Sequence, residues 1–98
     1  MQHAVIAYLI PAADLDVFDV EDRLIEAIDT AGVGEFDGNL MGPGEVELYA
    51  YGPDADALFE VMEPILHSVP VKEGSYVTKR YGEAGEDARE VRVDLTPS

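Results

Sequence analysis

The sequence predicts one α+β domain, in which two helices cover one face of a mainly antiparallel sheet. Its 98 residues are the size of a single domain. Two apolar stripes with helical spacing are interspersed with segments that have the two-residue period of a strand. The resulting order, β-α-β-β-α-β plus an extra C-terminal strand, predicts a ferredoxin-like sandwich, because right-handed crossovers place both helices on one face. We expect the domain to span residues 1–95, followed by a short tail at 96–98.

The first strand and the first helix are predicted within residues 3–32. His3 to Ile10 is apolar on both parities, as in a central strand, and Pro11 ends it. Gly32 is the expected stop of the helix that follows. Three aspartates crowd the predicted start of this helix, where acidic residues cap free amides: Asp14, Asp16 and Asp19. Its expected buried stripe is Val20, Leu24, Ile25 and Ile28, with Glu21, Asp22, Glu26 and Asp29 outside it.

A glycine-rich hairpin is predicted next. Residues 33–41 and 45–51 form its strands, and Gly42-Pro43-Gly44 forms its turn. Asp37-Gly38-Asn39 in the first strand is either a turn or a bulge. The second strand alternates regularly. One side carries Val46, Leu48 and Ala50, and the other carries Glu45, Glu47, Tyr49 and Tyr51.

The second helix is expected to begin at Asp54 or Asp56, which are both suitable caps. Pro64 lies inside its apolar pattern, so we expect a kink there or a break at Glu63. The expected stripe is Leu58, Phe59, Met62, Ile65 and Leu66. Two alternating strands, 75–81 and 89–95, complete the order, and the last should extend an edge or pair with the fourth.

The composition narrows the function classes. Six basic and 21 acidic residues give a formal net charge of −15, so binding to nucleic acid or to an anionic membrane is not expected. The chain has no cysteine, which excludes disulfides, thiolate nucleophiles and cysteine-bound metals. With no signal-like or membrane-spanning segment, we expect a cytoplasmic protein. Three interpretations of the acidity stay open: solubility or adaptation to salt, a basic protein partner, and cation binding.

The sheet face without helices, called the open face below, is the predicted binding surface. If Val46, Leu48 and Ala50 face the helices, then tyrosines of the same strand lie on the open face. Tyrosine is favoured at interfaces because it combines an apolar body with a polar tip. The expected binding residues are Tyr8, Glu47, Tyr49, Tyr51 and Lys79, with Tyr76 or Tyr81 as a further member. The sequence leaves open which parity of the first strand faces the helices, and this decides whether Tyr8 belongs to the face. Lys79 and Arg80 point to opposite faces, and one of them is expected to pair with acids such as Glu47.

Two runs resemble a group of small acidic bacterial α/β proteins that has no known activity. They are Gly34-Glu35-Phe36-Asp37-Gly38-Asn39 and Tyr49-Ala50-Tyr51-Gly52-Pro53-Asp54-Ala55-Asp56, which fit the patterns G-x-F-D-G-N and Y-x-Y-G-P-D-A-D. The resemblance covers residues 33–66 and 74–77. It implies the same fold and assigns no activity.

No catalytic or metal-binding motif is recognisable. His3 and His67 are isolated in the sequence, without the spacing of a catalytic triad or a zinc site, and no cofactor is implied. The weak metal candidates are the hairpin oxygens of Glu35, Asp37, Asn39 and Glu45, whose spacing is not that of an EF-hand loop.

The leading hypothesis is therefore a non-catalytic binding module that uses its open face either to form a homodimer or to hold a protein partner, such as a basic toxin. The alternative is a small dimeric ferredoxin-like enzyme or ligand-binding protein with a pocket between two facing sheets.

Overall fold

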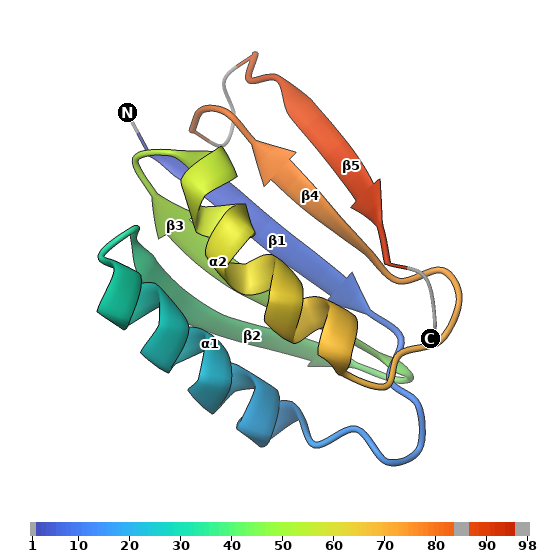
Figure 1. Cartoon of the computed structure of the whole chain (residues 1–98). Helices are drawn as coiled ribbons and strands as arrows, with labels where there is room; N and C mark the ends of the chain where they lie inside the picture. Colours follow the sequence, from blue (N-terminus) through green and yellow to red (C-terminus); the bar gives the residue numbers. More distant parts are fainter. Residues whose placement is uncertain (1, 84–86, 96–98) are drawn as a thin grey trace.

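The computed structural model describes residues 2–83 and 87–95, and it forms one five-stranded antiparallel sheet with two helices (Figure 1). The predicted tail at 96–98 lies outside the described residues. The elements are β1 (His3–Leu9), α1 (Val17–Ala31), β2 (Glu35–Gly42), β3 (Glu45–Gly52), α2 (Ala55–Ser68), β4 (Tyr76–Arg80) and β5 (Glu90–Asp94). The strand order is β2-β3-β1-β4-β5. This arrangement confirms the predicted ferredoxin-like fold with an extra C-terminal strand.

The central position of β1 explains its composition. It pairs with β3 on one side and with β4 on the other, and both helices lie across the same face of the sheet (Figure 1). The extra strand β5 pairs with β4 and forms the edge opposite β2. The predicted alternation of β3 is confirmed. The core side chains on the helix side of β1 and β3 are Val5, Ala7, Leu9, Val46, Leu48 and Ala50.

Helix α1 begins and ends as its sequence predicts, but its buried face is turned. The Asp16 side chain accepts hydrogen bonds from the first-turn amides, and Gly32 closes the helix with a φ of 67°. The prediction that Ile25 is buried and Glu21 exposed was wrong: Ile25 is 46% exposed, and Glu21 is 9% exposed. Asn39 Nδ2 donates a hydrogen bond to Glu21 Oε1 at 2.8 Å, which compensates for the burial of that side chain.

Helix α2 passes through its proline without a break. Asp54 provides the cap by accepting from the amides of Asp56 and Ala57. The helix then continues to Ser68 with Pro64 inside it, so the alternative of a break at Glu63 is wrong. Most of the expected apolar stripe is buried, and Ile65 packs half-buried against the core.

A buried serine fixes the neighbouring ends of β1 and β4. Ser75 is almost fully buried, and its hydroxyl accepts from the Ile10 amide at 2.9 Å and donates to the Lys72 carbonyl at 2.8 Å. Tyr8 and Tyr76 lie next to this junction and are direct partners across the two strands. The serine network therefore holds together the strand ends that carry these two tyrosines.

Candidate functional site

The strand register defines the open face. Residues directly opposite one another on neighbouring strands lie on the same face of a sheet, so each row crosses the sheet from β2 to β5. The three rows are Leu40, Glu47, Tyr8, Tyr76 and Asp94; then Gly38, Tyr49, Ile6, Thr78 and Arg92; then Glu35, Tyr51, Ala4, Arg80 and Glu90. Glu45, two residues before Glu47, lies on this face at the hairpin end of β3.

Four of the five predicted site residues lie together on the open face, and the fifth does not. Tyr8, Glu47, Tyr49 and Tyr51 occupy neighbouring positions on β1 and β3. The placement of Lys79 was wrong. Its register partner is Val5 of the core, and its ammonium group binds Asp56 of α2 at 3.1 Å, on the helix side. The signal that shows this in the sequence is Val77, which has the same parity as Lys79.

The last two strands add aromatic and cationic side chains to the open face. Tyr76, Arg80 and Arg92 lie there, whereas Tyr81 binds Asp56 on the helix side. Tyr8 and Tyr76 stack with ring centroids 5.0 Å apart and planes inclined by 27°. The guanidinium carbon of Arg92 lies 3.9 Å from the Tyr76 ring centroid. Arg92, Tyr76 and Tyr8 form a stack across three neighbouring strands.

Carboxylates surround the other end of this stack. The Tyr8 hydroxyl donates to Glu45, and the Tyr49 hydroxyl donates to Glu47 at 3.3 Å. The bond to Glu45 is the main cause that raises the pKa of Tyr8, and burial beside Glu47 raises the pKa of Tyr49. Both phenols therefore remain protonated donors at neutral pH. Within residues 2–83 and 87–95, Glu45 and Glu47 form no ion pair, and Glu35 forms none either.

A second polar cluster lies on the helix side, at the start of α2. Asp56 accepts from the Tyr81 hydroxyl at 2.5 Å and pairs with Lys79. The Tyr81 bond, and then the Lys79 bond, lower the pKa of Asp56, while the bond to Asp56 raises the pKa of Lys79. Lys79 also lies over the Phe59 ring, with its nitrogen 5.1 Å from the centroid. This cluster attaches β4 to α2, and the Asp56 carboxylate is already engaged by Lys79 and Tyr81.

The Asp56 cluster predicts a specific acid titration. Because its pKa is lowered by folding, Asp56 contributes stability that is present above its ordinary pKa of 3.8 and is lost as the pH falls through the lower folded value. In an NMR titration of the side-chain carboxyl carbon, we expect a midpoint below 3.8. Tyr81→Phe should move this midpoint upward, while Tyr76→Phe, on the other face, should leave it unchanged. An unchanged midpoint in Tyr81→Phe would contradict the assigned cause.

The two histidines have structural partners. The Ala55 amide donates to Nδ1 of His3 at 3.0 Å, so this ring nitrogen accepts a hydrogen bond from the first residue of α2. The His3 and Tyr81 rings form a T-shaped pair, with centroids 5.6 Å apart and planes inclined by 74°. His67 lies beside Glu63, which precedes it by one turn of α2. The distance between His67 Nε2 and the Glu63 carboxylate oxygen is 3.3 Å. In these contacts neither histidine pairs with a serine or threonine hydroxyl.

The weak metal candidates are divided between the two faces of the sheet. Asn39 binds Glu21 on the helix side, whereas Glu45 binds Tyr8 on the open face. The register changes between Phe36 and Gly38, so the segment around Asp37 is a bulge and not a turn. In the described ranges, no three His, Cys, Asp or Glu side chains are grouped closely enough to hold a metal ion.

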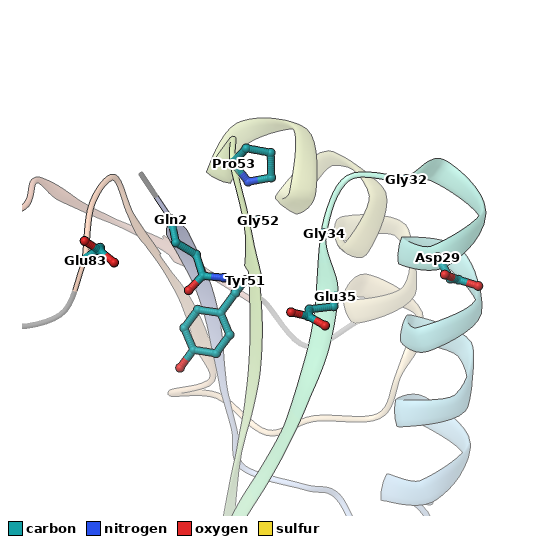
Figure 2. A pocket seen from close by; sticks show the side chains of 9 residues that line it. All are labelled: Gln2, Asp29, Gly32, Gly34, Glu35, Tyr51, Gly52, Pro53 and Glu83. Atoms are coloured by element: carbon teal, nitrogen blue, oxygen red, sulfur yellow. The ribbon is translucent and has the colours of Figure 1, made fainter.

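A pocket of about 740 Å³ opens at the end of the sheet where β1 and β2 begin and β3 ends (Figure 2). Figure 2 shows Tyr51 and Glu35 on neighbouring strands, so the pocket adjoins the open face. Its acidic lining residues are Asp29, Glu35 and Glu83, and its remaining lining residues are Gln2, Gly32, Gly34, Tyr51, Gly52 and Pro53. The pocket lacks the closed apolar walls typical of a small-molecule site, and its carboxylates extend the negative charge of the face.

The strand ends that line this pocket approach each other closely. A Cβ atom built on Gly34 would lie 2.1 Å from the Tyr51 carbonyl oxygen, and one built on Gly52 would lie 2.3 Å from the Val33 carbonyl oxygen. Only glycine fits at both positions without a backbone shift. These two glycines set the distance between the β2 and β3 backbones beside Tyr51.

No helix in the described part of the chain combines the length and the apolar character needed to cross a membrane. No family model, curated protein or solved structure matches this chain.

Proposed function

We propose that this protein is a non-catalytic binding module whose open face holds a basic protein partner. The observation that carries the proposal is the composition of that face, where tyrosines stand among Glu35, Glu45 and Glu47, which form no ion pair within the described residues. Both helices lie on the opposite side of the sheet, so no secondary structure covers these side chains.

The side chains of the open face suit a protein surface. Its central positions are Ile6, Tyr8, Tyr49 and Tyr76, which combine apolar area with hydroxyl groups. Aromatic side chains of this kind are enriched in the cores of protein interfaces. Leu40, on the edge strand β2, is 59% exposed and extends the apolar area beyond the tyrosines.

The charge of the face selects a basic partner over a second copy. Glu35, Glu45 and Glu47 line its β2–β3 side, while Arg80 and Arg92 on β4 and β5 stand beside Glu90 and Asp94. The face is therefore net negative, and so is the whole chain at −15. Two copies would repel each other, whereas a cationic protein would be attracted and oriented by the same field.

The proposal is tested by mapping a basic probe on the protein by NMR. A lysine–glycine repeat peptide is titrated at physiological ionic strength, and the amide shifts are followed. We expect the shifts to concentrate on β1, β3 and β4. The exposed acids of α1 provide an internal control, because Asp19, Asp22 and Glu26 offer negative charge without a tyrosine. Equal shifts on α1 would show attraction by charge alone and would overturn the proposal.

Two variants and one mass measurement complete this test. Tyr49→Ala combined with Tyr51→Ala should abolish the shifts on the sheet, while Asp22→Asn combined with Glu26→Gln should preserve them. Light scattering at low and high salt should give the monomer mass. A dimer that dissociates in the double tyrosine variant would assign the face to self-association and would contradict the basic-partner proposal.

A further inference from the structure

The tyrosine stack has one ring face directed toward carboxylates. Strand order places Arg92, Tyr76 and Tyr8 in succession on β5, β4 and β1, so Tyr76 lies between the other two. The side of the Tyr8 ring turned away from Tyr76 therefore faces β3. In the described part of the chain, no other aromatic ring stacks on Tyr8.

The residues at that end of the stack are two glutamates. Glu47 lies directly opposite Tyr8 across β1 and β3, and Glu45 accepts the hydrogen bond from the Tyr8 hydroxyl. A carboxylate has about four acceptor positions, and the phenol occupies one of those on Glu45. The Tyr49 hydroxyl takes one acceptor position on Glu47, so each carboxylate keeps further acceptor positions for a donor above the Tyr8 ring.

The same chain shows which donor fits this combination of groups. At the opposite end of the stack, the Arg92 guanidinium lies 3.9 Å from the Tyr76 centroid, and its Nε donates to Asp94 at 2.9 Å. An aromatic ring and a carboxylate on the open face thus hold an arginine of this chain. Tyr8 with Glu45 and Glu47 is the same combination with one carboxylate more.

We infer that the Tyr8 end of the stack is a subsite for an arginine side chain of the partner, with its guanidinium on the Tyr8 ring and hydrogen bonds to Glu45 and Glu47. This inference rests on the proposed function and specifies its anchor residue. A planar guanidinium stacks on the ring and donates several hydrogen bonds in its own plane at once, which the compact ammonium of lysine does not do. The subsite should therefore prefer arginine to lysine.

The preference is measured with two peptides of equal length and charge, an arginine–glycine repeat and a lysine–glycine repeat. We expect the arginine peptide to bind about tenfold more tightly, with the largest shifts at Tyr8, Glu45 and Glu47. Glu45→Gln combined with Glu47→Gln should remove this preference and leave the folded spectrum intact, because Glu45 is exposed, Glu47 is only half-buried, and neither belongs to the core. Asp22→Asn combined with Glu26→Gln makes the same charge change on α1 and should retain it.

The ring is tested separately from the carboxylates. Tyr8→Phe retains the stacking surface and should keep most of the arginine preference, whereas Tyr8→Leu should lose it. Equal binding of both peptides on the open face would overturn the arginine subsite and leave the proposed function standing. Binding of neither peptide to this face would overturn both. An arginine preference that survives in the double glutamine variant would also overturn the subsite.

Discussion

Gly52→Ala is expected to lower the free energy of unfolding by about 3 kcal/mol or more. The added Cβ would stand 2.3 Å from the Val33 carbonyl oxygen and 3.2 Å from the Gly34 Cα atom, and both are backbone atoms. A flexible side chain could turn away, but here the strands themselves must separate. Because a domain is stable by only about 5–15 kcal/mol, the loss is large, and urea unfolding followed by circular dichroism measures it.

Gly42→Ala is the matched control. At Gly42 the nearest atom to an added Cβ is Glu45 Oε1 at 3.4 Å, at the end of a side chain that can move. The same chemical change at the other end of the hairpin should alter the unfolding free energy by less than about 1 kcal/mol. Equal losses in the two variants would show that the close approach at Gly52 does not determine the effect.

Leu48→Ala is expected to cost about 2–5 kcal/mol, through lost burial and the cavity left behind. Leu48 is fully buried in the strand next to the sheet centre and belongs to the core beneath the helices. The change removes the same atoms as Leu40→Ala on the adjacent strand, where the side chain is 59% exposed. Thermal and urea unfolding of these two variants should show that the loss of stability depends on the burial of the leucine and not on the residue type.

The expected cost of Leu40→Ala is within about 0.5 kcal/mol. A comparable loss in both leucine variants would contradict the assignment of the helix side as the core. Since Leu40 lies in the row that contains Glu47 and Tyr8, its variant also serves the binding tests as a folded protein with a smaller apolar edge.

Much of the fold was predictable because apolar and polar residues recur with a regular period in several strands and helices. In β3, apolar and polar residues alternate strictly, so Val46 and Leu48 identified the core side and placed Tyr49 on the open face. In β1 the period is ambiguous, because Ala4 and Ile6 are apolar on the side opposite Val5. Only the pairing of Tyr8 with Glu47 decides its side, and pairing depends on residues far away in the sequence.

Two errors show where local patterns are insufficient. Ile25 follows Leu24 by one residue, which rotates it about 100° around the helix axis, and α1 turns the Glu21 side toward β2 instead. The hydrogen bond from Asn39 compensates for the burial of the Glu21 carboxylate in that orientation. This hydrogen bond in turn depends on the bulge before Gly38, which sets the face on which Asn39 lies. Lys79 was misplaced for a different reason: its charge suggested a surface site, although Val77 gave the correct parity.

The position of β1 at the sheet centre has a consequence for the time course of synthesis. β1 is translated before both of its partners, since Ile6 pairs with Tyr49 and with Thr78. During translation, one edge of this apolar strand therefore stays unpaired until β3 is synthesised. The other edge stays unpaired longer, until β4 is synthesised. Closing such long loops costs entropy and slows folding. The net charge of −15 should then make neighbouring nascent chains repel each other, and we expect this repulsion to oppose aggregation of the incomplete sheet.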